Sequence, residues 1–302
     1  MQPAKPPAPS TTPTDPSHAR ASASVALLRN SDQGLEVLML RRHAQVSTMP
    51  GVYVFPGGKL DEADTSADSA SLLDQSASDL QHSLSEPGTD TPTASGLYFA
   101  ALRETLEECG LLLAESTAQA ASIDALRARA MLREGMAFCD VLRTLQLRLQ
   151  TKQLAPWARW ITPTSPSVGP RRFDTRFFVA PAPEGQIALH DNEETTESVW
   201  VKPRTALEQY RDGDIDLVPP QIMTLAQLAQ HGQVASVLSA ARRQPPPTIL
   251  PEAHDEDGKR IICYPGDAQH SVRERALPGP TRMHWHQQRF IPEGGFEALW
   301  NL

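Results

Sequence analysis

Residues 97–115, LYFAALRETLEECGLLLAE, constrain the fold more than any other segment of this chain. They are rich in Ala, Leu and Glu, which favour helix, and Gly110 stands near their end, where glycine commonly stops a helix. We therefore predict one long helix that ends at about Gly110. Any fold for this chain has to pack the apolar side of this helix against a core and also place its carboxylates.

Three glutamates of this helix, Glu104, Glu107 and Glu108, stand at positions i, i+3 and i+4. This spacing puts them on one helical face, where like charges repel. Arg103 is the nearest base and can reach Glu107 one turn on. A divalent cation such as Mg²⁺ would explain the cluster, because it takes carboxylate oxygens together with water and substrate phosphates. The alternative interpretation is an ordinary charged helix face.

The rest of the central region alternates between strand and helix patterns. Strands are predicted at 21–30 and 35–42, separated by the turn SDQG, and a short strand precedes the turn FPGG at 55–58. Two helices are predicted within 116–150. The later strands are predicted at 158–163, 171–180 and 197–203, and the later helices at 205–210 and 220–242, with an interruption at Gly232.

The acidic residues are concentrated in one stretch. The chain carries 28 Lys and Arg against 36 Asp and Glu, a formal net charge of −8. No Lys or Arg lies between Lys59 and Arg103, and eight acids lie there, as many as the whole net charge. We expect residues of about 65–95 to form an insertion that projects into solvent, with a weak helix at 71–80. An acidic chain of this kind argues against a nucleic-acid partner.

The two ends of the chain have a different composition. Residues 1–20 are rich in Pro, Ser and Thr and are predicted to be a disordered tail. Residues 245–302 form a Pro-rich C-terminal extension in which we predict one strand, KRIICYP. This extension could cover a binding site or form a contact between two copies, so a homodimer is compatible with the sequence.

Nothing in the sequence predicts a membrane or export. There is no apolar run of the roughly 18–20 residues that a membrane helix needs, and no secretory signal at the N-terminus. The three cysteines are odd in number and form no CxxC pair, so we predict neither a disulfide framework nor a zinc site. We therefore expect a cytoplasmic protein.

The glycine turn and the glutamate helix together resemble the signature of the Nudix hydrolase family, G-x5-E-x7-R-E-U-x-E-E-x-G-U, where U is aliphatic. Gly58 matches the first glycine, and residues 103–111 match the second half except at Thr105. Asp64 stands where the family has Glu. From this acid to Arg103 there are 38 residues in place of seven, which amounts to an insertion of 31 within the signature.

A split signature of this kind is similar to the Nudix branch that includes the peroxisomal coenzyme A diphosphatases. The shared features are MPG at 49–51, VFPGG at 54–58, Asp61, Asp64 and the helix, followed by WARWITP, RRFDTRFFVA and EETTESVWVKP. The resemblance spans roughly residues 21–240, so we predict a Nudix domain at 21–244. It implies an α+β fold, with a mixed β-sheet sandwiched between α-helices and a long insertion inside the Nudix box.

The resemblance also implies a reaction, which is metal-dependent hydrolysis of a nucleoside diphosphate linked to another moiety. Glu104, Glu107 and Glu108 would bind Mg²⁺ or Mn²⁺, and Arg103 would brace these carboxylates. The general base would be a box glutamate, Glu104 or Glu107, or a glutamate of the later loop HDNEETTE, which offers Glu193, Glu194 and Glu197. We favour Glu194 in this loop.

The leading substrate is coenzyme A or acyl-CoA, which would give 3′,5′-ADP and a phosphopantetheine product. Some CoA-specific relatives carry a motif similar to LLTxRS-x3-R-x3-G-x3-FPGG. Leu38, Arg42, Gly51 and the FPGG turn match this motif, whereas Met39, Leu40, His43 and Ser47 depart from it. The predicted substrate-binding residues are Arg42, Gly57, Gly58, Arg172 and Arg176, the two last on one face of a strand. The alternatives are an ADP-ribose or dinucleotide pyrophosphatase and a catalytically silent nucleotide-sensing module.

Overall fold

A computed structural model describes residues 19–46, 49–118, 123–164, 172–256, 259–300 and 302. At its centre lies an eight-stranded sheet. Its strands are β1 (Arg20–Ser31), β2 (Gly34–Arg42), β3 (Tyr53–Val54), β4 (Gly57–Lys59), β7 (Ala155–Ile161), β8 (Phe173–Pro181), β9 (Thr195–Val201) and β10 (Thr248–Ile249). They run in the order β10-β7-β8-β1-β2-β3, with β4 paired to β1 and β9 to β2. Because β1 is parallel to β8 and antiparallel to β2, the sheet is mixed, as predicted.

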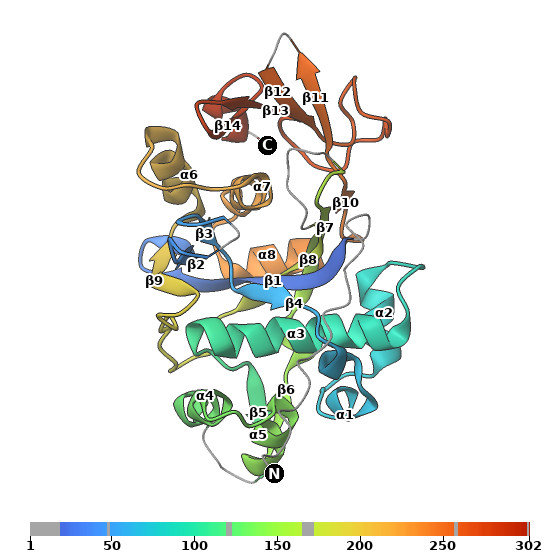
Figure 1. The fold of residues 1–302 in the computed structure, drawn as a ribbon, viewed down its shortest axis with the longest axis vertical. Coiled ribbons are helices and arrows are strands. Elements are labelled where there is room, and N and C mark those ends of the chain that lie inside the picture. The colour runs from blue at the N-terminus through green and yellow to red at the C-terminus, as the bar shows by residue number, and fades with distance from the viewer. Residues whose placement is uncertain (1–18, 47–48, 119–122, 165–171, 257–258, 301) are drawn as a thin grey trace, which may run out of the picture.

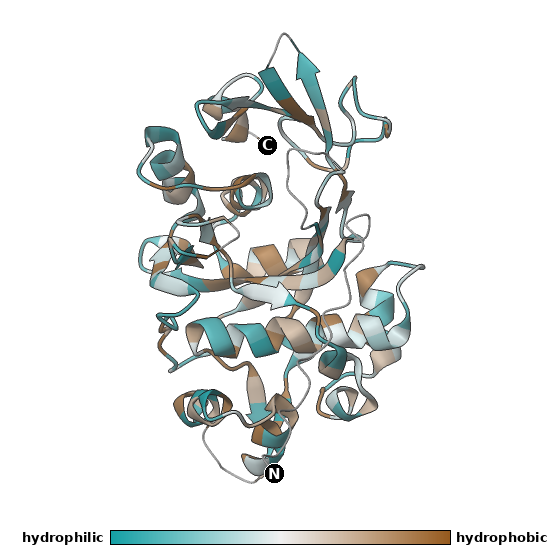
Figure 2. Ribbon diagram, in the orientation of Figure 1, coloured by the Kyte–Doolittle hydropathy of each residue, from teal (hydrophilic) through white to brown (hydrophobic). Residues whose placement is uncertain are grey.

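Helices cover both faces of this sheet (Figure 1). Helix α3 (Thr91–Cys109) lies on one face, and α6 (Pro203–Asp212), α7 (Pro219–Leu228) and α8 (Val234–Ala241) lie on the other. Side chains alternate along β1, so that Val25 and Leu27 pack towards α3 while Ala26 and Leu28 pack towards α7. Figure 2 shows the hydrophobic colour on the sheet and on α8. The prediction of a sheet sandwiched between helices is confirmed.

The predicted glutamate helix is α3, and its two ends have clear local causes. Asp90 caps the N-terminus by accepting a hydrogen bond from the Thr93 N–H at 2.8 Å. Gly110 ends the helix in the left-handed conformation, at φ 70°, which glycine adopts without strain. The helix begins six residues before the predicted start, because the cap at Asp90 recruits a stretch of Thr, Ser and Gly that has low helix propensity of its own.

The prediction that the insertion projects into solvent is wrong for most of its length. A short 3₁₀ turn (Glu62–Thr65) leads into the insertion, which contains the helices α1 (Ala67–Ala70) and α2 (Ala77–Leu84). Leu80 and Leu84 of α2 are buried in the core that also contains α3. Two leucines four residues apart give α2 an apolar stripe, which the surrounding Ser and Asp residues obscure in the sequence. The predicted weak helix at 71–80 therefore lies further along, at 77–84.

One acid of the insertion, Glu86, is also buried and joins a network of ion pairs. Its Oε2 lies 2.6 Å from Nη2 of Arg176 and 3.2 Å from Nη1 of Arg159. Both arginines also pair with Asp174 of β8. This network fastens the insertion to β7 and β8. It also accounts for part of the acidic excess, because these charges neutralise arginines of the sheet.

Two helices and a pair of short strands complete the side of the molecule that contains α3. The region 116–150 contains α4 (Ala125–Arg133) and α5 (Phe138–Thr144), which confirms the two predicted helices. A strand pair not predicted from the sequence, β5 (Ala114–Ser116) with β6 (Leu147–Leu149), brackets them. Each of these strands has only three residues, too few for a periodic pattern.

The C-terminal extension contains more structure than the one predicted strand. After β10, it forms an antiparallel sheet of β11 (Glu252–Glu256), β12 (Lys259–Cys263), β13 (Arg282–His286) and β14 (Arg289–Pro292), followed by a 3₁₀ turn (Phe296–Leu299). The predicted strand KRIICYP is β12. Figure 1 shows this second sheet beyond α6 and α7, on the side away from α3. The proline-rich composition hid the other strands, which are short and end in loops.

Two remaining expectations concern the N-terminus and membranes. Of the predicted tail, residues 1–18 lie outside the described residues, and Arg20 already belongs to β1. Within the described part of the chain, no helix has the length and apolar character needed to cross a bilayer.

The Glu86 network leads to a prediction about stability. We expect Glu86→Gln to lower the free energy of unfolding by about 3 kcal/mol, because it removes one of the two carboxylates that the buried Arg176 and its neighbour Arg159 share. Chemical denaturation measures this change. Glu62→Gln, an exposed glutamate just before the insertion, is the control and should change it by less than about 0.5 kcal/mol. Equal effects of the two substitutions would show that the network does not stabilise the insertion.

Candidate active site

The last two turns of α3 bring the three predicted glutamates to the surface of the helix nearest β4. Glu108 is buried, Glu104 is mostly buried, and Glu107 is 39% exposed in its side chain. The end of α3 nearest α4 takes the hydrophilic colour in Figure 2. The face predicted from the i, i+3, i+4 spacing is therefore real, but its members differ in burial.

Arg103 lies at the centre of this acidic group. Its Nη1 donates to Oε1 of Glu104 at 2.9 Å and to Oε2 of Glu107 at 3.1 Å. Its Nε and Nη2 donate to the two carboxylate oxygens of Asp64 at 3.0 and 2.9 Å, a bidentate pair. Asp64 is only 2% exposed. The predicted bracing role of Arg103 thus has a geometric basis, and Asp64 acts by holding this arginine.

The glycine turn packs directly on the helix. The N–H of Gly57 donates to Oε2 of Glu108 at 2.9 Å. A Cβ atom at Gly58 would lie 2.2 Å from Oε1 of Glu104, and one at Gly57 would lie 2.3 Å from the carbonyl oxygen of Ala23. Any larger residue would therefore push the helix carboxylate or the neighbouring strand away. The two glycines are required because backbone and carboxylates approach this closely.

Burial shifts the titration of these glutamates. Desolvation raises the pKa of Glu104 to about 7, although Arg103 opposes the shift. Desolvation also raises the pKa of Glu108 well above its ordinary value, and the neighbouring charge of Glu104 adds to this effect. The site therefore carries carboxylates whose negative charge is poorly compensated, which is a setting that favours a bound cation.

The later loop, which contains Glu194, also lies beside the glutamates of α3. Glu194 lies close enough for its charge to raise the pKa values of both Glu104 and Glu108, although burial is the main cause of both shifts. Its own side chain is 64% exposed and lies 3.9 Å from Nη2 of Arg42. The structure therefore brings Glu194 and Arg42 to the box glutamates.

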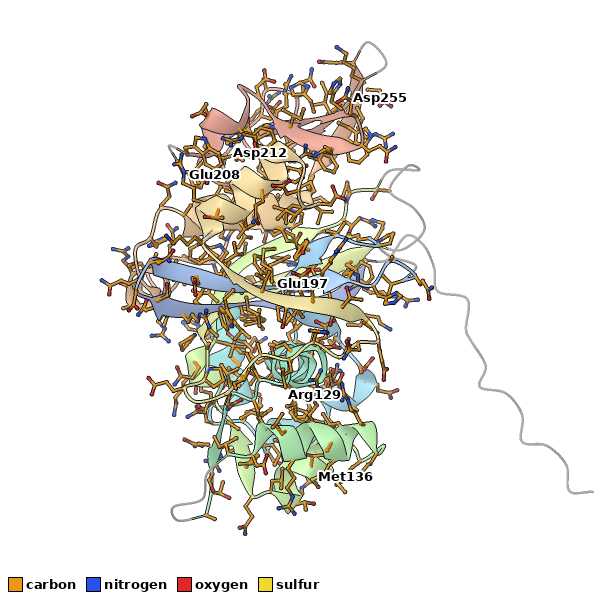
Figure 3. All side chains as sticks on the ribbon, turned by 90° about the vertical axis from the view of Figure 1, so that its left-hand side faces the viewer. Arg129, Met136, Glu197, Glu208, Asp212 and Asp255 are labelled. Carbon is orange, nitrogen blue, oxygen red and sulfur yellow. The ribbon has the colours of Figure 1, made fainter. Side chains whose placement is uncertain are left out.

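The other two loop candidates, Glu193 and Glu197, are exposed, and Glu197 accepts a hydrogen bond from the Tyr53 hydroxyl at 2.7 Å. Figure 3 shows Glu197 on β9.

Asp191, which the sequence analysis missed, shapes this loop. Its Oδ1 accepts hydrogen bonds from the backbone N–H groups of Glu193, Glu194 and Thr195 at 2.8–3.1 Å. Burial alone would raise the pKa of Asp191, but these donors outweigh it, so the pKa is lowered and the side chain is an anion. An Asx turn of this kind is the signal that could have identified it.

Arg129 of α4 is a second residue that the sequence analysis missed. It donates to the carbonyl oxygens of Glu107, Glu108 and Leu189 at 2.7–3.3 Å. These bonds cap the C-terminal end of α3 and tie it to the segment that leads into the Glu194 loop. Figure 3 shows Arg129 beside the end of α3. No local pattern identifies it, because its partners are backbone atoms far along the chain.

A cleft of about 680 Å³ opens beside these groups. Gly57, Gly58, Arg42 and Glu194 line it, and so do apolar residues of β7, β8 and α7. This volume is in the range of small-molecule sites.

The two arginines predicted on β8 have different surroundings. Arg176 is buried and its guanidinium is engaged by Glu86 and Asp174, so we do not retain it in the proposed substrate site. Arg172 lies just before β8 and donates from Nε to the carbonyl oxygen of Thr162, which lines the cleft. It therefore stays a candidate at the rim.

The residues fit a hard divalent cation in chemistry, although they do not form a closed ligand cage. In the described residues, no three Asp, Glu, His or Cys side chains converge as a ready ligand set. Arg103 holds Glu104 and Glu107, and Gly57 holds Glu108, so each carboxylate keeps a protein partner. Carboxylate oxygens are nevertheless the donors that Mg²⁺ and Mn²⁺ prefer. Glu104 and Glu108, whose pKa values are raised, supply them here together with the nearby Glu194.

Comparison with known proteins identifies the family. The family model described as the NUDT19 Nudix domain matches residues 15–228. A Xenopus laevis protein named acyl-coenzyme A diphosphatase NUDT19 is 27% identical over 238 residues, which cover 68% of this chain and 63% of that protein. A Gallus gallus protein of the same name is 29% identical over 268 residues, covering 72% of this chain and 70% of that protein.

Among solved structures, a Nudix hydrolase from Alicyclobacillus acidocaldarius aligns with a TM-score of 0.58 at 26% identity, covering 76% of this chain and 99% of that one. The alignment agrees with the mixed sheet between helices described above. The fold, the glutamate helix beneath its glycine turn and the family match agree: this chain belongs to the NUDT19 Nudix domain family of the Nudix hydrolases.

Proposed function

We propose that this chain is a Nudix pyrophosphohydrolase that cleaves the diphosphate of coenzyme A or acyl-CoA, giving 3′,5′-ADP and a phosphopantetheine product. The observation that carries the proposal is the pair of buried carboxylates, Glu104 and Glu108, held under the Gly57–Gly58 turn at the edge of the cleft. The similarity to proteins named acyl-coenzyme A diphosphatase supports this choice of substrate.

In this proposal Glu104, Glu107 and Glu108 hold Mg²⁺ or Mn²⁺. Bound there, the metal would neutralise the diphosphate charge and lower the pKa of an attacking water. Arg103 fixes the rotamers of Glu104 and Glu107, and Gly57 fixes Glu108. Most of the catalytic effect at phosphorus then comes from positioning and from charge stabilisation.

Glu194 is our candidate for the group that accepts the proton of the attacking water, with Glu104 and Glu107 as the box alternatives. Glu194 is exposed to solvent, and Asp191 fixes the backbone of its loop. Its neighbour Arg42 lines the cleft and can donate to phosphate oxygens. Substrate contacts are assigned to Arg42, to the Gly57–Gly58 turn and to Arg172 at the rim.

A substrate panel tests the proposal. The panel contains CoA, an acyl-CoA, ADP-ribose, NADH and a diadenosine polyphosphate, each with Mg²⁺ or Mn²⁺. We expect release of 3′,5′-ADP from CoA or acyl-CoA at a rate well above the others. Preferred turnover of ADP-ribose or of a dinucleotide would contradict the assigned substrate. Tight nucleotide binding without any turnover would favour a sensing module.

Replacing the most buried of the three helix glutamates tests the catalytic assignment. We expect Glu108→Gln to lower kcat by about 100-fold or more, because the neutral amide cannot stabilise a divalent cation. Glu115→Gln, an exposed glutamate just beyond the helix, is the matched control and should behave like the unaltered chain. A near-normal rate in Glu108→Gln would contradict the assignment of Glu108 to the metal site.

The glycine turn gives a steric test. Gly58→Ala places a methyl group 2.2 Å from Oε1 of Glu104, so this carboxylate has to move. We expect kcat to fall by about tenfold or more while the circular dichroism spectrum stays unchanged. Gly88→Ala, where nothing lies within 4 Å of the added methyl, should leave activity intact. If both variants keep full activity, the close approach has no role in catalysis.

The raised pKa of Glu104 predicts how stability depends on pH. Between its ordinary pKa of 4.5 and about 7, the folded chain binds more protons than the unfolded chain. The free energy of unfolding should therefore fall as the pH rises through this window. Added Mg²⁺ should oppose the fall, because it compensates the ionised carboxylates.

Thermal unfolding at pH 5 and pH 8, with and without Mg²⁺, measures this effect. We expect the rise in Tm on adding Mg²⁺ to be larger at pH 8 and to be reduced in Glu104→Gln. An equal rise in Tm at both pH values would count against a metal held by these carboxylates.

A further inference from the structure

The C-terminal extension contributes to the cleft although it lies outside the family match, which ends at residue 228. Pro251, Ile262 and Phe290 of the extension line the same cleft as the Gly57–Gly58 turn. These three residues are apolar, and so are their neighbours in the lining, Trp160 and Phe173. The extension therefore adds an apolar wall to a site whose catalytic groups are charged.

Within the lining, Arg42 and Glu194 lie on the other side of the central strand from the apolar residues that the extension joins. Arg42 ends β2 and Glu194 precedes β9, and both of these strands lie on one side of β1. Trp160 and Phe173 belong to β7 and β8, which lie on the other side. The extension joins that second side, because β10 pairs with β7 at Ile249 and Trp160. The cleft thus runs across the sheet from Arg42 and Glu194 to the apolar residues beside the extension.

The apolar wall is held firmly to the Nudix core. The Tyr210 hydroxyl of α6 donates to the carbonyl oxygen of Phe290 at 3.0 Å and accepts from its N–H at 2.8 Å. The Arg289 guanidinium lies over the Tyr210 ring at 4.5 Å. Ile262 and Met283 are buried in the same hydrophobic cluster as α7. A wall fixed in this way loses little conformational entropy when a ligand binds.

One polar group in the lining has no partner. Gln221 of α7 is buried, and its side-chain oxygen accepts no hydrogen bond from the described residues. An orphan buried acceptor is costly in a folded protein and calls for an explanation. Because Gln221 lines the cleft, a ligand there that carries an N–H group would satisfy this oxygen once the side chain turns towards it.

We propose that the C-terminal extension forms the subsite for the acyl-pantetheine part of the substrate, with Phe290 and Ile262 as its apolar wall and Gln221 accepting from an amide N–H. The inference rests on the proposed function. It assigns the non-nucleotide part of the substrate, which combines amides with an aliphatic chain, to the side of the cleft away from Arg42 and Glu194. A diphosphate placed against Arg42 leaves this chain directed towards the extension.

Phe290→Ala tests the wall, because it shortens the side chain and keeps the backbone bonds to Tyr210. The measurement is kcat/KM for hexanoyl-CoA and for free CoA. We expect Phe290→Ala to lower the ratio of kcat/KM for hexanoyl-CoA to kcat/KM for CoA by about tenfold. The change should come from a higher KM for hexanoyl-CoA, because the acyl group loses its apolar contact. Phe296→Ala, a half-buried phenylalanine of the same extension that does not line the cleft, is the control and should keep the ratio. An unchanged ratio in Phe290→Ala, or an equal change in both variants, overturns the proposal.

Gln221→Met provides a second variant that keeps the side-chain volume and removes the acceptor. We expect KM to rise several-fold for both CoA and hexanoyl-CoA while kcat stays the same; an unchanged KM contradicts the role of Gln221. If Phe290→Ala fails to fold, Phe290→Leu replaces it, with a smaller change expected in the same direction.

If the unaltered chain hydrolyses neither compound, the proposed function fails. Isothermal titration calorimetry of hexanoyl-CoA and CoA binding then tests whether the extension forms the subsite. Tighter binding of hexanoyl-CoA than of CoA that is lost in Phe290→Ala supports the wall, and equal binding rejects it.

Discussion

The guanidinium of Arg103 holds together parts of the chain that lie far apart in the sequence. It donates hydrogen bonds to both carboxylate oxygens of Asp64 and to the carbonyl oxygen of Lys59. It also donates to Glu104 and Glu107 on its own helix. A planar, permanently charged group is suited to this task because it offers donors in fixed directions. The extra residues between Asp64 and Arg103 fold into α1, α2 and the first turns of α3, so the insertion can be accommodated without moving the glutamates. Loop closure of this length adds little entropic cost.

The glycine turn and the helix end depend on the same close packing. Gly58 leaves the space that the Glu104 carboxylate occupies, and the Gly57 N–H fixes Glu108. Burial then raises the pKa values of both carboxylates, so the site is electrostatically unfavourable until a cation or a proton is added. Contacts outside the signature hold the backbone on either side of the site, with Arg129 at the end of α3 and Asp191 in the Glu194 loop.

The sequence predicted those features that depend on local pattern. The helix with its stop at Gly110, the glycine turn and the gathering of Glu104, Glu107 and Glu108 on one face follow from spacing and composition, whereas the mixed sheet was implied by the resemblance to the Nudix family. It did not predict Arg129, Asp191 or the engagement of Arg176 by Glu86, because each of these joins residues or backbone atoms that are distant or carry no periodic signal. The buried leucines of α2 were obscured for a related reason: two apolar residues among many Ser and Asp look like a solvated segment.

The proposed activity requires the separated halves of the box to assemble into a single metal-binding catalytic site beside the cleft. A crystal structure of the chain soaked in Mn²⁺, with the metal located by its anomalous scattering, tests this requirement. We expect a peak roughly 2.0–2.3 Å from carboxylate oxygens of Glu104 and Glu108, beneath the Gly57–Gly58 turn. A crystal with no peak at these residues, or with its metal bound elsewhere, would contradict this expectation.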